Sequence, residues 1–247
     1  MLAVLLALTK IMPLSVAITQ SNYIPWKGYF DLMRSADVFV LYDSVQYTKR
    51  DWRNRNRIKT PQGGQWLSIP VRVKSRYLQQ IRDVAIAEPR WHERHWAGLH
   101  GNYRAAPHYD VIAPEIADLY DRCAGITHLS QVNALLLRGL ADLLGVRTPF
   151  VDSTTLGSRP GRTENLVHLC RELGATTYLS GPAAQDYLDE RLFEEVGIAV
   201  QYFDYAGYKV YPQLHGSFDH NVSAVDLLMN TGTQAAQYLD RVDRAAP

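Results

Sequence analysis

Cysteine, long apolar runs and net charge are all scarce in this sequence, and each scarcity excludes a class of protein. The two cysteines, Cys123 and Cys170, stand far apart in segments with helical patterns, which is typical of buried thiols in a reducing cytoplasm and not of a disulfide framework. The strongest apolar run, residues 2–8, is far shorter than the ~20 residues that cross a bilayer. With 26 Lys+Arg against 25 Asp+Glu, the whole molecule has no electrostatic preference for nucleic acid or anionic lipid. We therefore expect a cytoplasmic protein with no membrane association.

The ends of the chain differ from its body. No positive charge precedes the apolar run at 2–8 and no cleavage site follows it, so it does not resemble a signal peptide. We expect residues 1–14 to be a non-native or disordered extension, with the natural start at Met12, and residues 241–247 to be a polar tail. With 47% apolar and 21% charged residues the remainder has a globular composition. Residues 15–240 are predicted to form a single domain.

Strand and helix patterns alternate along this domain. Apolar, β-rich runs occupy 15–19, 38–42, 150–152, 177–180 and 198–202, and helical patterns at 30–35, 163–173 and 185–195 lie between them. Helices are also predicted at 91–103, 113–123 and 129–144, and a β-rich run broken by Pro70 lies at 65–73. The alternation predicts an α/β fold with a mostly parallel sheet flanked by helices and a helical insertion at about 90–146.

Three loops begin where predicted strands end, and ligands of open α/β sheets bind at that edge. The first loop, 20–29, combines amides, aromatic rings and one cation around Pro25 and Gly28. Its candidate binding residues are Gln20, Asn22, Tyr23, Trp26 and Tyr29, and Lys27 is a candidate catalytic residue for acid/base or charge-stabilising work. The alternative is an aromatic turn that plugs the end of the sheet.

The second loop contains a run of positive charge, which we call the basic segment and define as Lys49–Lys59. It holds six Lys/Arg and one Asp, so a local excess of five positive charges is hidden in the neutral total. In an extended chain Arg53, Arg55 and Arg57 would share one face, and Asn54 and Asn56 the other. The hypothesis is anion binding, with Trp52 stacking on a ring. The alternative is a solvated charged stretch. Candidate catalytic residues are Asp43, Lys49 and Arg55, and Gln46 is a further candidate for substrate binding.

The third loop, 180–187, is a turn between a predicted strand and a predicted helix. Ser180, Gly181 and Tyr187 are candidate binding residues, because a helix N-terminus after a glycine turn attracts anions. No Walker lysine, G-x-G-x-x-G pattern or G-x-S-x-G elbow is present. His92 and His95 lie three residues apart without an evident third ligand, so no metal is expected.

Several stretches resemble the WbqC-like proteins of bacteria. The resemblance rests on Q-S-N-Y-I-P-W-K-G-Y at 20–29, A-D-V-F-V-L-Y-D-S-V-Q-Y-T-K-R-D-W-R-N-R-N at 36–56, Y-L-S-G at 178–181 and the stretch 223–232. Ser21 stands where many members of that family have proline. The order of elements around 25–29 is also similar to the opening of nucleotidyltransferase-type (HUP-like) folds, but Trp26 and Tyr29 replace the two histidines of their H-x-G-H motif.

The resemblance implies a tailoring enzyme of O-antigen or natural-product biosynthesis. Such an enzyme would attach an amino acid, with glycine one suggestion, or an acyl group to a sugar or small-molecule acceptor through an amide or ester bond. ATP, a thioester on an acyl or peptidyl carrier protein, and an aminoacyl-tRNA are all possible sources of the activated donor. The alternative is a noncatalytic module that binds a nucleotide, a nucleotide-sugar or RNA through the basic segment.

Overall fold

The structure, a computed structural model, describes residues 13–241. The apolar run at 2–8, Met12 and residues 242–247 lie outside the described residues. The fold already includes Leu14, whose backbone N–H donates to the Thr176 hydroxyl at 2.9 Å. Arg241 also belongs to the fold and not to a tail, because its guanidinium pairs with the buried Asp31 carboxylate at 2.9 Å.

Five strands form one sheet in which every neighbouring pair is parallel. They are β1 (Ser15–Thr19), β2 (Val38–Leu41), β5 (Phe150–Asp152), β6 (Thr177–Ser180) and β7 (Ala199–Tyr202), arranged in the order β5-β2-β1-β6-β7. The chain builds outward from β1 to one edge and then returns to build the other half. This is a doubly wound sheet whose strand order reverses between β1 and β6. The expected parallel α/β fold is confirmed.

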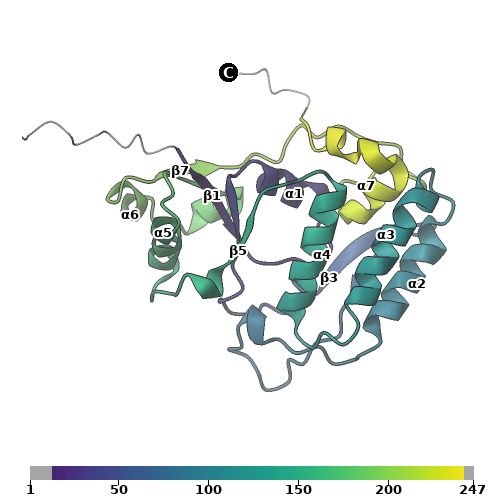
Figure 1. The fold of residues 1–247 in the computed structure, drawn as a ribbon, viewed down its shortest axis with the longest axis horizontal. Coiled ribbons are helices and arrows are strands. Elements are labelled where there is room, and N and C mark those ends of the chain that lie inside the picture. Colours follow the sequence, from purple (N-terminus) through teal and green to yellow (C-terminus); the bar gives the residue numbers. More distant parts are fainter. Residues whose placement is uncertain (1–12, 242–247) are drawn as a thin grey trace, which may run out of the picture.

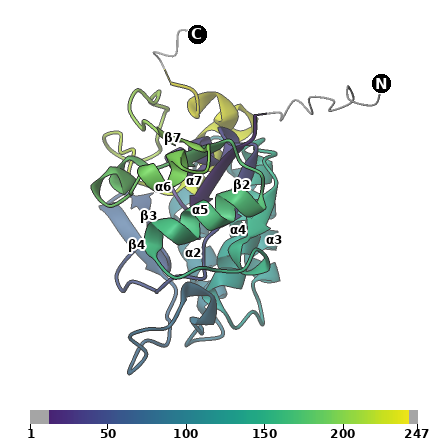
Figure 2. The same ribbon diagram turned by 90° about the vertical axis from the view of Figure 1, so that its left-hand side faces the viewer.

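Alternate side chains of the central strand point to different helical layers. Val16 and Ile18 pack in the core beneath α5 (Arg162–Glu172) and α6 (Arg191–Glu194). Ala17 packs in the core on the other face, with α1 (Lys27–Arg34). Figure 1 shows α5 and α6 on one side of the strands and α1 on the other, and Figure 2 shows α5 and α6 from the front.

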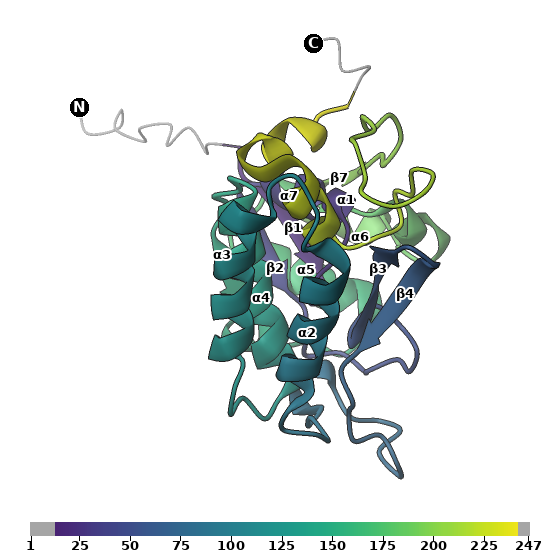
Figure 3. The same cartoon turned by 90° about the vertical axis from the view of Figure 1, so that its right-hand side faces the viewer.

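The middle of the chain supplies the outer helices on the α1 side. These are α2 (Trp91–Tyr103), α3 (Tyr109–Arg122) and α4 (Leu129–Leu143), joined there by α7 (Ala224–Thr231) (Figure 3). In α4 the apolar positions Leu129, Val132, Leu136 and Leu140 recur at helical spacing and are all buried. Ser223 caps the N-terminus of α7, since its hydroxyl accepts from the Val225 N–H at 3.2 Å.

A second sheet is an antiparallel hairpin of β3 (Arg55–Thr60) and β4 (Gly63–Ser68). The β-rich run expected at 65–73 therefore covers only part of β4, and β3 lies inside the basic segment, which the sequence patterns did not identify as a strand. The predicted alternation is confirmed, because Asn56 is buried while Arg55 and Arg57 are partly exposed. The charged residues of β3 mask its strand pattern in the sequence, because this strand packs only one face against the core.

The C-terminal half departs from prediction at two helices. The helix expected at 185–195 is replaced by the 3₁₀ turn η3 (Pro182–Asp186) and the single-turn helix α6. The helix α5 begins one residue before the predicted range, with Gly161 at its N-cap at φ of 91° and Thr163 buried in the first turn. The remaining 3₁₀ turns are η1 (Ile81–Asp83), η2 (Ser153–Thr155) and η4 (Gly232–Tyr238). Because α6 is so short, the third candidate loop has no long helix to attract an anion.

Two further features bear on the environment of the protein. Cys123 and Cys170 are both buried free thiols, and burial raises the pKa of each to about 12. Such thiols carry little thiolate at neutral pH, so neither is a ready nucleophile. Within residues 13–241, no helix combines the length and the apolar character needed to cross a bilayer.

Candidate functional site

The loop between β1 and α1 is held in a fixed conformation by buried polar contacts. The Ser21 N–H donates to the Asp43 carboxylate at 2.9 Å, a bond that a proline at this position could not make, and the Ser21 hydroxyl accepts from the Asn133 amide at 3.0 Å. Ile24 has φ of 33°, a left-handed conformation that β-branched residues avoid. Backbone strain of this kind concentrates at functional sites, where the surrounding structure maintains it.

Tyr23 anchors this loop in the core. Its hydroxyl lies 2.7 Å from His95 Nδ1 and 2.5 Å from the Tyr120 hydroxyl, and its ring is fully buried. His95 Nε2 lies 3.1 Å from the Ser68 carbonyl oxygen, so Nε2 carries the proton and Nδ1 accepts from Tyr23. Burial lowers the pKa of His95 to about 4, which keeps the imidazole neutral. Tyr23 was a candidate binding residue, but the structure places it behind the site.

A cavity of about 730 Å³ opens where the strand order of the sheet reverses, and we call it the switch-point cavity. Ile18 and Thr19 at the carboxyl end of β1 and Tyr178 of β6 contribute to it, as expected near the switch point of a doubly wound fold. Its lining comprises Ile18, Thr19, Gln20, Tyr42, Ser44, Val45, Gln46, Thr48, Gln80, Ser158, Arg159, Gly161, Arg162, Asn165, Leu166, Tyr178 and Tyr187. Three candidate residues from three different predicted loops, Gln20, Gln46 and Tyr187, are thus brought together.

Two arginines give the switch-point cavity its positive charge. Arg159 and Arg162 are exposed, and neither makes an ion pair within residues 13–241. The Arg162 guanidinium lies 3.1 Å from the centre of the Tyr187 ring, which orients it. The Asn165 amide fixes the wall by accepting from the Arg159 N–H at 2.6 Å and donating to the Tyr42 hydroxyl at 2.6 Å. Sequence reasoning missed both arginines, although the loop 157–161 also follows a strand end.

A second cavity, of about 140 Å³, is lined from the same loop, and we call it the Trp52 cavity. It is lined by Asn22, Pro25, Trp26, Trp52, Asn56 and Asn221. Four of these were candidate binding residues. Asn221, which completes the set, lies just before α7 and was missed. The loop containing Asn221 reaches the cavity because the Ser223 N–H donates to the Arg57 carbonyl at 2.8 Å and the Ala224 N–H to the Pro25 carbonyl at 2.8 Å.

Aromatic stacking supports both indoles of the Trp52 cavity. The Trp52 ring packs on Trp66 at 5.4 Å between centroids, and the Arg55 guanidinium lies 4.3 Å from the Trp66 ring. Trp26 contacts Tyr205 at 5.4 Å on the far side. Trp26 also lies directly over Gly28, where a β-carbon would come within 2.3 Å of the indole. The predicted aromatic walls therefore exist, and Trp26 requires glycine at position 28.

The cations of the basic segment are mostly engaged with other parts of the protein. Arg53 donates to the Asn22 amide oxygen and lies 3.6 Å from the Asp51 carboxylate, and Arg57 pairs with Asp219 at 3.3 Å. Lys59 is buried, where its ammonium donates to Gln213 at 2.6 Å and to the Ser217 carbonyl. Lys49 is exposed, with its ammonium 4.8 Å from the Tyr77 ring centre. The cluster of free cations expected from the sequence is thus dispersed among internal partners.

Other candidates line neither of these cavities. Both polar groups of the Asn54 amide are bonded, to the Tyr47 hydroxyl and the Ile69 carbonyl, each at 2.9 Å. Tyr29 is buried, and its hydroxyl donates to the Gln20 carbonyl at 3.0 Å. The Ser180 hydroxyl, also buried, donates to the Tyr178 hydroxyl at 3.1 Å, and Gly181 leads into η3. These residues support the residues that line the cavities but do not line the cavities themselves.

Lys27 and Asp43 are buried titratable groups close to the loop. The Lys27 ammonium donates to the Lys209 carbonyl at 2.6 Å and lies 5.1 Å from the Tyr208 ring centre. Burial lowers the pKa of Lys27 to about 8, although Asp31 opposes this shift. Burial raises the pKa of Asp43, against the bonds from Ser21 and the charge of Arg53. Neither side chain lines the two cavities, so any influence on a ligand there acts through the loop.

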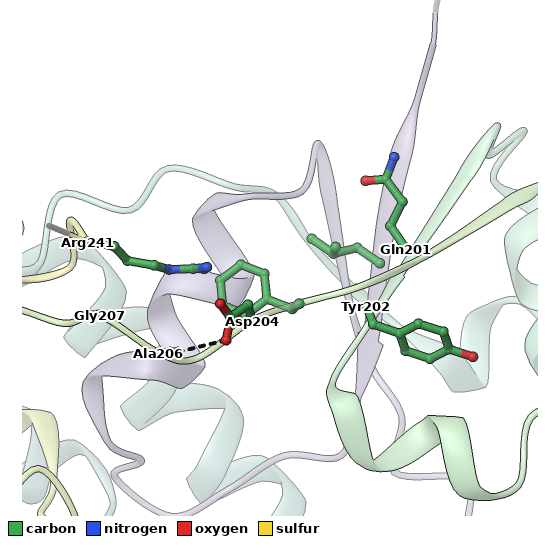
Figure 4. A pocket seen from close by; sticks show the side chains of 8 residues that line it. Gln201, Tyr202, Asp204, Ala206, Gly207 and Arg241 are labelled. Atoms are coloured by element: carbon green, nitrogen blue, oxygen red, sulfur yellow. Dashed lines mark hydrogen bonds between the residues drawn. The ribbon is translucent and has the colours of Figure 1, made fainter. Parts of the chain in front are cut away.

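Two further features of the described residues supply no additional site. Within residues 13–241 no group of three or more His, Cys, Asp or Glu is arranged to hold a metal ion. A third hollow, of about 370 Å³, lies beside β7 and includes Gln201, Tyr202, Asp204 and Arg241 (Figure 4). Its arginine already pairs with Asp31 and stacks on Phe203 at 4.1 Å, so it is not available for an anion.

The described residues form a doubly wound α/β protein with a cavity at the switch point of its sheet. The chain belongs to the WbqC-like protein family, whose match covers residues 20–238. It is similar to the uncharacterized protein Rv1507c of Mycobacterium tuberculosis, with 50% identity over 224 residues that cover 91% of this chain and 96% of the relative. No solved structure matches the chain. The resemblance seen in the sequence is confirmed, and the family match includes the whole lining of the Trp52 cavity and all of the switch-point lining except Ile18 and Thr19.

Proposed function

We propose that the protein is a biosynthetic tailoring transferase or ligase. It would attach an amino acid, such as glycine, or an acyl group to a sugar or small-molecule acceptor by amide or ester formation, in O-antigen or natural-product biosynthesis. The observation that supports this proposal best is the pairing of a positively charged cavity with a neutral one on the same loop. A group-transfer enzyme must bind a donor and an acceptor next to each other.

The switch-point cavity suits the donor. Its volume lies within the usual range of about 300–1,000 Å³ for small-molecule sites. Arg159 and Arg162 offer forked donors to a phosphate or carboxylate, and Tyr42 and Tyr187 offer rings for stacking. ATP, a carrier-bound thioester and an aminoacyl-tRNA all contain phosphate and a ring or a flexible arm. We propose one of these as the source of the activated group, acting in the reducing cytoplasm that the free thiols suit.

Asp43 and Lys27 act as positioning residues in this proposal. Asp43 fixes the backbone at Ser21, between the two cavities, and thereby sets their separation. Lys27 holds the segment at Lys209 against α1 by donating to the Lys209 carbonyl. Electrostatic stabilisation of the reacting group would come from preorganised donors at the cavity, chiefly the arginines.

The test is ligand binding by the intact chain, measured by calorimetry and by thermal shift with ATP and with coenzyme A. A ligand at 100 times its Kd raises the free energy of unfolding by about 2.7 kcal/mol. Substituting Arg162→Ala should weaken binding of the effective ligand roughly tenfold, because a charge-assisted hydrogen bond is lost. Pyrophosphate or AMP release in the presence of amino acids would then identify the ATP-dependent route.

Arg171→Ala is the matched control, because Arg171 is exposed on the same helix α5 and does not line the cavity. It should leave binding unchanged. If neither ATP nor coenzyme A binds, and an aminoacyl-tRNA also fails to bind, the proposed donor site is wrong. Equal affinities of the two arginine variants would also remove Arg162 from the site.

A noncatalytic nucleic-acid module is the second candidate, because one feature favours it. Trp52 and Trp66 are each more than two-fifths exposed, and Lys49 and Arg50 are exposed in the same region of the chain. Indoles beside cations bind single strands by stacking and charge. Affinity for a short oligonucleotide that falls steeply with salt, with a slope of several charges, would favour this function over the transferase.

A further inference from the structure

We infer that the Trp52 cavity binds a neutral polyhydroxylated ring, such as a pyranose sugar. Six residues line it: Asn22, Pro25, Trp26, Trp52, Asn56 and Asn221. In its role as acceptor site this inference rests on the proposed function, but the binding itself does not. The shape of the cavity, the polar groups in it and the absence of charge in its lining each restrict the ligand.

The volume restricts the ligand to a single ring. A cavity of about 150 Å³ is large enough for one benzene molecule, and the Trp52 cavity measures about 140 Å³. Its opening to solvent lets substituents of a ring project outward. Indoles present flat apolar faces, which complement the C–H face of a sugar ring as well as they complement an aromatic ring. The walls alone therefore define a flat ligand of one ring.

The polar groups favour hydroxyl substituents on that ring. Each asparagine amide both donates and accepts hydrogen bonds, as a hydroxyl does. Within residues 13–241 the Nδ2 group of Asn22 and the whole side-chain amide of Asn221 have no hydrogen-bond partner. Asn56 is already bonded to the Tyr23 carbonyl at 3.1 Å and forms the floor. Two free amides on opposite chain segments can therefore bind hydroxyls on different edges of one ring.

The charges around the cavity argue against an ionic ligand. No charged residue belongs to the lining. Four cations lie next to lining residues in sequence, and all of them contact other parts of the protein. Arg57 pairs with Asp219, and Arg53 contacts Asp51 and Asn22. Lys27 donates to the Lys209 carbonyl, and Arg55 donates to the Arg50 carbonyl. Taking an unpaired charge out of water is costly, so a phosphate or carboxylate on the ring would bind poorly here. The two cavities thus differ in ligand charge, with the anion assigned to the switch-point cavity.

The two cavities adjoin each other along the loop. Gln20 lines the switch-point cavity and Asn22 the Trp52 cavity, and the Cα atoms of residues two apart are separated by at most about 7 Å. A hydroxyl or amino group on the ring would therefore lie near the end of a donor in the neighbouring cavity. This arrangement makes the ring the acceptor of the proposed transfer.

The experiment measures binding of methyl glucoside, methyl galactoside and N-acetylglucosamine to the full chain by saturation-transfer NMR, in the absence of any donor. We expect one or more of these sugars to bind. Trp52→Ala and Asn221→Ala should each weaken binding roughly tenfold. Tyr77→Ala is the control, because Tyr77 is an exposed aromatic residue outside the cavity and its loss should leave binding unchanged. Unaltered circular dichroism would show that the variants fold.

Every other outcome of this experiment either supports or contradicts the inference. The inference is wrong if none of the three sugars binds, if glucose 6-phosphate or adenosine binds in preference to them, or if Trp52→Ala binds like the wild type. Sugar binding without binding of any donor would support the inference and contradict the proposed transferase. Donor binding at Arg162 without sugar binding would contradict the inference and leave the proposed transferase supported.

Discussion

The cations of the basic segment and the arginines of the switch-point cavity differ in whether other parts of the protein bind them. In the basic segment Arg53, Arg57 and Lys59 contact acids, amides or carbonyls of the protein itself. At the switch-point cavity Arg159 and Arg162 face solvent without an acidic partner in the described chain. Charge density along the sequence therefore indicates where cations gather but not whether they are free. A run of cations can hold a hairpin to the core, whereas two isolated cations at a strand end can form a binding site.

The strongest test of this comparison is Lys59→Ala. The buried ammonium donates to the Gln213 side chain and to the Ser217 carbonyl, so its removal loses two charge-assisted hydrogen bonds. We expect the free energy of unfolding to fall by about 4 kcal/mol, as measured by urea denaturation. Lys49→Ala, an exposed cation of the same segment, should change it by less than about 0.5 kcal/mol. A stable Lys59→Ala protein would mean that this cation is not structural.

The next effect concerns pH and the contact between the hairpin and the β1–α1 loop through His95. The unfolded imidazole has a pKa of about 6.5 and the folded one about 4, so the unfolded state binds more protons between these values. The stabilising contribution is complete above about pH 6.5 and is lost as the pH falls toward 4. Relative to His95→Gln, the wild type should lose up to about 3 kcal/mol over this range. Parallel stability curves for the two proteins would contradict the assignment of a neutral His95.

The smallest expected effect is that of Arg57→Ala. Its ion pair with Asp219 is at the surface, with each side chain about three-tenths exposed. Such pairs contribute less than about 1 kcal/mol, and a double-mutant cycle with Asp219→Ala should measure a coupling of that size. Binding of ATP or coenzyme A should not change. A loss of donor binding in this variant would restore the anion site that the sequence predicted in the basic segment.

Part of the candidate site could be read from the sequence. Gln20, Asn22, Trp26, Trp52 and Asn56 were recognised because polar and aromatic residues mix at predicted strand ends, and all five line a cavity. Tyr23 and Asn54 have the same chemistry, but their polar groups are bonded inside the protein. Which side of a loop faces a cavity depends on contacts with distant segments, which no local pattern contains.

The sequence by itself determined the family and the parallel α/β class, because the strand and helix periods and the motifs at 20–29 and 36–56 are local properties. It also determined the α4 helix, because apolar residues within 129–144 recur at helical spacing. Only the tertiary structure placed Asn221 beside Trp52 and Arg159 beside Gln20, and only it joined the cations of the basic segment to their partners. The residues of the switch-point cavity come from segments far apart in the chain, and the reversal of strand order between β1 and β6 brings them together.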